Sequence, residues 1–159
     1  MSNTTGIILR NLIVQLGYPQ EIADMVVDSI LDWKDIDELH RLNGAESDYY
    51  QTLPNPCKAK NASFDTLEEL LLVKGVTPEL LYGNGKQKGL AAFLTVFAKT
   101  NKIQINAAPR ELLASIPGMT DDLMENIMTA RTMGQIGKIR DLQNVIANKC
   151  ECQPKIDHL

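Results

Sequence analysis

Histidine and cysteine are scarce in this chain of 159 residues. Neither of its two histidines has a serine or cysteine at the spacing typical of a catalytic nucleophile. No histidine lies close enough to Cys150 and Cys152 in the sequence to complete an ordinary zinc site. Cys57 could form a disulfide with either of them or stay free. We therefore expect a protein that is not an enzyme.

Aromatic residues and positive charge are also low. Aromatics make up 5% of the chain, and 20 acidic residues against 16 basic ones give a net charge of −4. Negative charge opposes binding to a phosphate backbone, and few aromatics leave little to stack on bases. No apolar run is long enough to cross a bilayer, and the N-terminus lacks the pattern of a signal peptide. With 44% hydrophobic residues, the chain can still bury a core.

Apolar residues recur at helical spacing along most of the chain. This spacing predicts helices over 7–16 and 19–33. Start and stop signals predict further helices over 65–73, 77–82, 109–114, 121–131 and 139–149, with Asp65 and Glu68 forming a capping box. Residues 90–98 could be helix or strand, and 102–106 could be a short strand. We predict an all-α domain over 7–149 with little or no strand. Residues 1–6 are expected to be cloning-derived or disordered, and 150–159 a tail.

Two segments repeat one pattern of helix, glycine, capping threonine and helix. The matched residues are Glu68, Leu70, Val73, Gly75, Val76, Thr77, Leu80 and Leu81 in one copy, and Glu111, Leu113, Ile116, Gly118, Met119, Thr120, Leu123 and Met124 in the other. The pattern is typical of helix-hairpin-helix (SAM-like) repeats, which bind DNA phosphates through backbone N–H groups. Here Pro78-Glu79 and Asp121-Asp122 occupy those positions, so acids would repel phosphate. A helix-hairpin-helix DNA-binding module is our alternative function.

Carboxylates are crowded in the two segments 32–38 and 43–50. Like charges repel one another, and a hard divalent cation would remove that repulsion. The spacing is not that of an EF-hand. The simpler interpretation is a solvated acidic loop whose charge is balanced by Lys34 and Arg41.

Several blocks carry a resemblance to a known family. They are Asp32-Trp33, Asn43-Gly44-Ala45-Glu46-Ser47-Asp48-Tyr49-Tyr50, Lys60-Asn61-Ala62, Phe64-Asp65-Thr66-Leu67-Glu68-Glu69-Leu70-Leu71-Leu72-Val73-Lys74-Gly75 and Ile105-Asn106-Ala107-Ala108-Pro109. In this order they resemble the minor pseudopilin K family of type II secretion systems, also called the general secretion pathway protein K family. The resemblance covers roughly 7–145.

The resemblance implies a non-enzymatic helical domain, inserted in a pilin-like body, that acts in protein export. It implies contacts with the minor pseudopilins I and J at the tip of a periplasmic pseudopilus. The full-length protein is expected at the periplasmic face of the bacterial inner membrane, held by an N-terminal helix that this chain lacks. The chain itself is expected to be soluble.

The resemblance also implies calcium. The matching ligand positions are Asp35, Asp37, Glu46 and Asp48, with Asp32 as a further candidate. Ser47 stands where the family commonly has an acid, so one ligand could be lost or replaced by water.

Two neighbouring tyrosines complete the set of candidate site residues. Tyr49 and Tyr50 could bind a partner protein, or they could anchor their own loop to the core.

Overall fold

The computed structural model describes residues 3–97, 102–134 and 136. Every regular element in these ranges is a helix, and the only strand-like pairing is an isolated bridge between Gly83 and Lys88. The predicted all-α class is therefore confirmed. Chain contacts divide the protein into two compact units, 1–102 and 103–159, and the boundary between them falls within the range 7–149 that the sequence assigns to one domain. None of the described helices has the length and hydrophobicity of a membrane span.

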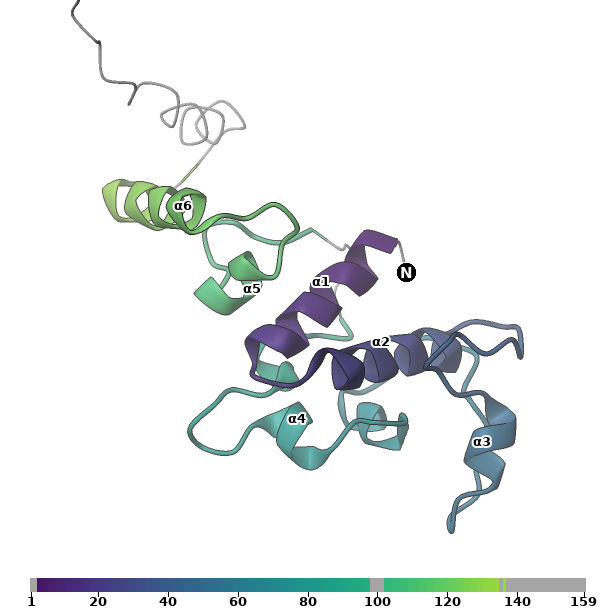
Figure 1. The fold of residues 1–159 in the computed structure, drawn as a ribbon. Coiled ribbons are helices and arrows are strands. Elements are labelled where there is room, and N and C mark those ends of the chain that lie inside the picture. The colour runs from purple at the N-terminus through teal and green to yellow at the C-terminus, as the bar shows by residue number, and fades with distance from the viewer. Residues whose placement is uncertain (1–2, 98–101, 135, 137–159) are drawn as a thin grey trace, which may run out of the picture. The chain divides into compact units, whose positions relative to one another are not determined.

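Two helices form the centre of the first unit (Figure 1). α1 (Asn3–Gln15) and α2 (Gln20–Lys34) pack against each other, and Leu12, Ile13 and Val26 are almost completely buried. Both predicted helices are confirmed. α1 starts at Asn3, inside the segment expected to be cloning-derived or disordered.

A third helix lies between the helices predicted over 19–33 and 65–73, where the sequence predicts none. α3 (Ser47–Gln51) is too short to be stable alone, so tertiary packing must hold it. Tyr50 supplies that packing, because its fully buried ring meets Trp33 of α2 edge to face, with centroids 4.9 Å apart. The Tyr50 hydroxyl accepts a hydrogen bond from the backbone N–H of Lys74 at 3.3 Å.

Three short elements complete the first unit: η1 (Glu68–Leu72), α4 (Pro78–Tyr82) and η2 (Leu90–Ala92). η1 is a 3-10 helix that begins at Glu68, so the predicted capping box between Asp65 and Glu68 is wrong. Glu69 accepts the backbone N–H of Asp65 instead, at 3.3 Å. Lys60 then binds both acids, at 2.6 Å to Asp65 and 2.8 Å to Glu69. The helix fails to start earlier because these side chains hold 60–67 in a loop.

The second unit contains α5 (Arg110–Ala114) and α6 (Asp121–Met133). Its buried core consists of Ala108, Leu113, Met124 and Ile127. Arg131 of α6 donates hydrogen bonds to the carbonyls of Ile105 and Ala108, the second at 2.9 Å. Residues 105–107 form a turn, so the predicted strand over 102–106 is wrong.

Some predictions fall on parts of the chain that the structure does not describe. The predicted helix over 139–149 and the tail with Cys150 and Cys152 lie outside the described residues. Cys57 is half-buried and has no disulfide partner within the part of the chain that the structure describes. The predicted domain boundaries stay predictions.

The two repeated corners have the same local geometry. Gly75 and Gly118 have φ values of +83° and +82°, which L side chains rarely adopt. Thr77 caps α4 by accepting from the N–H of Leu80, and Thr120 caps α6 in the same way. The assignment of the corners as complete helix-hairpin-helix repeats stays a prediction.

Candidate metal centre

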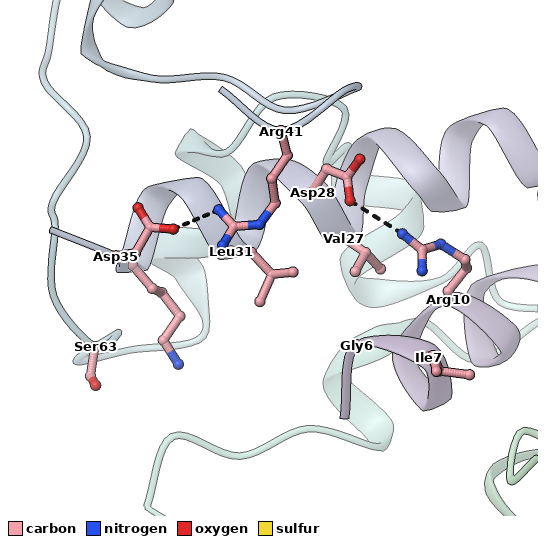
Figure 2. A pocket seen from close by; sticks show the side chains of 10 residues that line it. Gly6, Ile7, Arg10, Val27, Asp28, Leu31, Asp35, Arg41 and Ser63 are labelled. Carbon is pink, nitrogen blue, oxygen red and sulfur yellow. Dashed lines mark hydrogen bonds and ion pairs between the residues drawn. The ribbon is translucent and has the colours of Figure 1, made fainter. Parts of the chain in front are cut away.

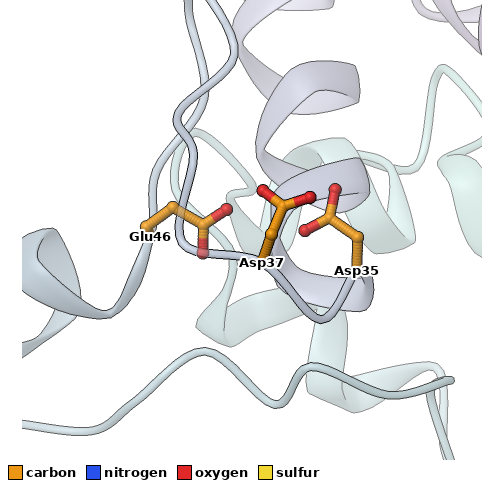
Figure 3. Close-up of side chains that lie close together, drawn as sticks. All are labelled: Asp35, Asp37 and Glu46. Atoms are coloured by element: carbon orange, nitrogen blue, oxygen red, sulfur yellow. The ribbon is translucent and has the colours of Figure 1, made fainter.

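Three carboxylates meet where α2 ends and α3 begins. Asp35 follows the last turn of α2, Asp37 lies in the next loop, and Glu46 precedes α3. One oxygen from each residue lies within 4.8 Å of the others, and Figure 3 shows the three side chains together. The sequence therefore brings acids from two separate segments to one place.

Glu46 is the least ordinary member of this cluster. Its side chain is 1% exposed, and neither carboxylate oxygen has a hydrogen-bond partner in the described part of the chain. Burial raises the pKa of Glu46 to about 7, and the negative charges of Asp32, Asp35 and Glu38 add to the effect. A buried carboxylate without a partner is costly, and a cation beside it would remove that cost.

Asp32 and Asp35 already share a cation within the protein. The Arg41 guanidinium binds both carboxylates, at 2.5 Å to Asp35, and the Arg41 backbone N–H donates to Asp32 at 3.2 Å. Asp32 is fully buried. The other oxygen of Asp35, Oδ1, is buried and has no hydrogen-bond partner among the described residues. Arg41 therefore neutralises Asp32 and leaves one oxygen of Asp35 for the cluster.

The turn after Arg41 is built closely around Asp32. A Cβ atom on Gly44 would overlap the Asp32 carboxylate, so this close approach requires glycine. Lys74 donates from Nζ to the Gly44 carbonyl at 3.0 Å. Asn43 donates from its backbone N–H and its side chain to Asp28, at 3.3 and 3.2 Å. The Asn43 bonds hold the turn onto α2, and the Lys74 bond joins it to the segment that follows η1.

Asp48 lies outside the three-carboxylate cluster. Its side chain is 73% exposed and contacts His40 Nε2 at 3.0 Å. The backbone N–H of Tyr49 donates to Asp48 at 2.6 Å, and this bond, together with that from His40, lowers the pKa of Asp48. Of the five predicted ligands, the structure brings together Asp35, Asp37 and Glu46. Asp32 is bound by Arg41, and Asp48 pairs with His40.

The chemistry of the cluster suits a hard cation. All three side chains offer oxygen, which calcium and magnesium prefer, and none offers sulfur or nitrogen. The unpartnered oxygens of Glu46 and Asp35 are the groups that a cation would satisfy. The residues present therefore fit the calcium that the family resemblance implies.

The two tyrosines have different environments. Tyr50 is fully buried, so its ring anchors α3 and is not exposed to a partner. Tyr49 is half-buried, with the Lys74 ammonium 5.0 Å from its ring centroid. Of the two tyrosines, only Tyr49 therefore keeps the predicted role in binding a partner.

A cleft of about 640 Å³ opens beside the cluster (Figure 2). It is lined by residues of α1 and the C-terminal part of α2, and by Asp35, Arg41 and Ser63. Arg10 pairs with Asp28 at 3.2 Å across it, and Arg41 pairs with Asp35. Lys34 also lines the cleft, which therefore holds two paired cations and a third positive charge. The cleft gives solvent a path to Asp35.

The structure of the two repeated corners, at Gly75 and Gly118, gives little support for DNA binding. The Thr77 and Thr120 side chains already accept one backbone N–H at the start of α4 and α6. Glu79 lies in the first turn of α4, and Asp121 and Asp122 lie in that of α6. A phosphate would meet carboxylates and fewer free donors, so these corners make poor phosphate sites.

Sequence reasoning missed several contacts that build the site. Ser47 Oγ donates to Glu38 at 3.1 Å and accepts from the Ala59 backbone N–H at 3.3 Å. Lys74 reaches Gly44 from a distant part of the chain. No local pattern signals such contacts, because they depend on how α3 and η1 pack.

Comparison with known proteins gives a consistent result. The family model described as "Type II secretion system (T2SS), protein K" matches residues 2–83, which include the whole acidic cluster. The chain is 33% identical over 73 residues to the type II secretion system protein K of Pectobacterium carotovorum, covering 46% of this chain and 22% of the relative. It is 28% identical over 123 residues to that of Pseudomonas aeruginosa, covering 77% and 35%. The chain thus spans about a fifth to a third of these relatives.

Among solved structures, the chain is similar to one in the GspK-GspI-GspJ complex of the type 2 secretion system from enterotoxigenic Escherichia coli. The sequence identity is 25%, the TM-score is 0.44, and the match covers 45% of this chain and 26% of that one.

Proposed function

The chain belongs to the type II secretion system protein K family, and from this premise we propose that it is the helical domain of a minor pseudopilin at the tip of the pseudopilus. In this role it acts without catalysis, through contacts with the minor pseudopilins I and J. The observation that carries the proposal is the family match over 2–83, because it includes α1, α2, α3, η1 and α4 as well as the acidic cluster. We place the full-length protein at the periplasmic face of the bacterial inner membrane.

A secretion assay tests this role. Deletion of the gene should stop release of the proteins that the type II system exports and leave them in the periplasm. The full-length gene supplied in trans should restore release. Unchanged export in the deletion strain, with the system otherwise intact, would contradict the proposal.

Calcium at the carboxylate cluster is the second part of the proposal. We assign Asp35, Asp37 and Glu46 as its protein ligands, supported by the proximity of their oxygens and by the buried, unpartnered carboxylate of Glu46. Asp32 and Asp48, which the sequence also suggests, are left out because Arg41, His40 and the Tyr49 N–H already satisfy them. When bound, the ion would supply positive charge that holds the C-terminal end of α2 close to the N-terminal end of α3.

Thermal unfolding in calcium and in chelator tests the ligand set. A ligand that binds only the folded state at a hundred times its dissociation constant adds about 2.7 kcal/mol of stability, so the Tm should rise with calcium. The double variant Asp37→Ala and Glu46→Ala should lose this rise. Asp48→Ala should keep it, since Asp48 lies outside the ligand set. A full calcium response in the double variant would show that the assignment is wrong.

A further inference from the structure

The loop over 36–42, here called the 36–42 loop, exposes three large aliphatic side chains. Ile36 is 86% exposed, Leu39 is 76% exposed and Leu42 is 96% exposed. Isolated exposed apolar residues are normal on protein surfaces, but three within one short loop are not scattered. Each of them would gain free energy on burial in an apolar environment.

Hydrogen bonds and ion pairs hold the backbone of the loop in place. The Arg41 guanidinium binds Asp32 and Asp35 of α2, and Asp37 accepts the backbone N–H of Leu39 at 3.0 Å. Glu38 accepts from the side chain of Ser47 at the start of α3. A loop that is already ordered loses little conformational entropy when a partner binds. The three aliphatic side chains are therefore presented on a fixed support.

Exposed charge around the loop is mainly negative. Asp37, Glu38 and Asp48 are exposed, whereas Arg41 is directed toward Asp32 and Asp35. The nearby base His40 already contacts Asp48. A complementary surface would therefore combine an apolar groove with Lys or Arg at its edge. Asp37 is a proposed calcium ligand, but Glu38 and Asp48 are not, so their negative charge is retained when the metal is bound.

We propose that the 36–42 loop is a docking surface for another subunit of the pseudopilus tip, which receives Ile36, Leu39 and Leu42 in an apolar groove edged by basic residues. The inference rests on the proposed function, since that function supplies the partner, and it goes further by naming the surface and its chemistry.

The test measures binding of the full chain to the purified soluble regions of minor pseudopilins I and J from the same organism. The variant Leu39→Ser with Leu42→Ser should weaken binding at least about tenfold, as expected for apolar anchors at the centre of an interface. Its Tm should stay that of the parent, because both side chains are exposed in the unbound chain. Binding by the parent should also weaken as salt rises, because the charges at the edge are screened.

A matched control removes an exposed leucine elsewhere. Leu72→Ser, in η1, alters a side chain that is 53% exposed and should leave the affinity unchanged. Equal affinity of the parent and the 36–42 loop variant would overturn the docking surface while leaving the proposed function intact. An equal loss in the Leu72 control would also overturn it. No binding of the parent to I and J would overturn both.

Discussion

The acidic region contains two groups of carboxylates that differ in how their charge is balanced. Asp32 and one oxygen of Asp35 are bound by the Arg41 guanidinium. Glu46 and the other oxygen of Asp35 are buried without a partner, and Asp37 lies beside them. Neighbouring carboxylates of one region therefore differ in how their negative charge is balanced. Arg41 binds the first group, and no described residue binds the buried oxygens of the second. The first group is balanced within the folded chain, and the second is the group to which we assign the proposed ion.

The largest expected effect on stability comes from disturbing the carboxylates that Arg41 binds. In Gly44→Ala, the added Cβ would overlap the Asp32 carboxylate, which is buried and cannot move freely. We expect a loss of about 3 kcal/mol in unfolding free energy, the upper end for overpacking. Chemical denaturation measures it. Gly6→Ala is the control, because its Cβ would make ordinary contacts at 3.7 Å or more and a helix favours alanine by about 1 kcal/mol. Equal effects of the two substitutions would contradict the close approach.

Removal of the internal cation should have the next largest effect. Arg41→Ala leaves the buried Asp32 with only a backbone donor. We expect a loss of about 2 kcal/mol, less than for a completely buried pair because the Arg41 side chain is 39% exposed. Lys34→Ala is the matched control at the end of α2, since the Lys34 ammonium lies 6.0 Å from the Phe64 ring centroid rather than on an acid. A loss in the control as large as in Arg41→Ala would remove the special role of Arg41.

The group of carboxylates around Glu46 should make the free energy of unfolding depend on pH. The pKa of Glu46 is raised from 4.5 to about 7 in the folded chain, so the folded state keeps a proton that the unfolded state releases. In chelator, stability should therefore fall as pH rises between about 4.5 and 7, by at most about 1.4 kcal/mol per pH unit. Glu46→Gln should flatten this slope and also abolish the calcium response. Unfolding free energies at several pH values provide the measurement, and an unchanged slope in the variant would contradict the assignment to Glu46.

The smallest effect is expected outside both groups. His40→Gln removes the base that contacts the exposed Asp48. Surface substitutions of this kind usually change stability by less than about 0.5 kcal/mol. The calcium-dependent rise in Tm should also be unchanged, as differential scanning fluorimetry can show. A lost calcium response would extend the metal site to this pair.

The sequence predicts most of the described helices, the short α4 and α5 included, but it misses α3 and places the start of η1 too early. Apolar periodicity is strong in α1 and α2, and both are confirmed. α3 is missed because burial of Tyr50, not local propensity, holds it in place. The helix expected from Asp65 starts later because Lys60 and Glu69 bind the residues that would cap it.

The candidate site is predicted only in part. The crowding of acids over 32–48 indicates a cation, and the structure gathers three of them. Arg41 binds some of the carboxylate oxygens, and others face the cluster of Asp35, Asp37 and Glu46. Which oxygen faces which group is not specified by the spacing of residues in the sequence. Balance of the acidic loop by Lys34 and Arg41 was one of the two interpretations. The structure supports it for Arg41, whereas the Lys34 ammonium lies near the Phe64 ring.

Trp33 gives this chain a built-in optical signal. It is the only tryptophan, it directly follows Asp32, and its ring is 3% exposed against Tyr50 of α3. If the segment between α2 and α3 opened, the indole would meet water and its fluorescence would shift to longer wavelength. Intrinsic emission can therefore follow the state of the acidic region in the unlabelled protein, in real time and without altering any of its carboxylates.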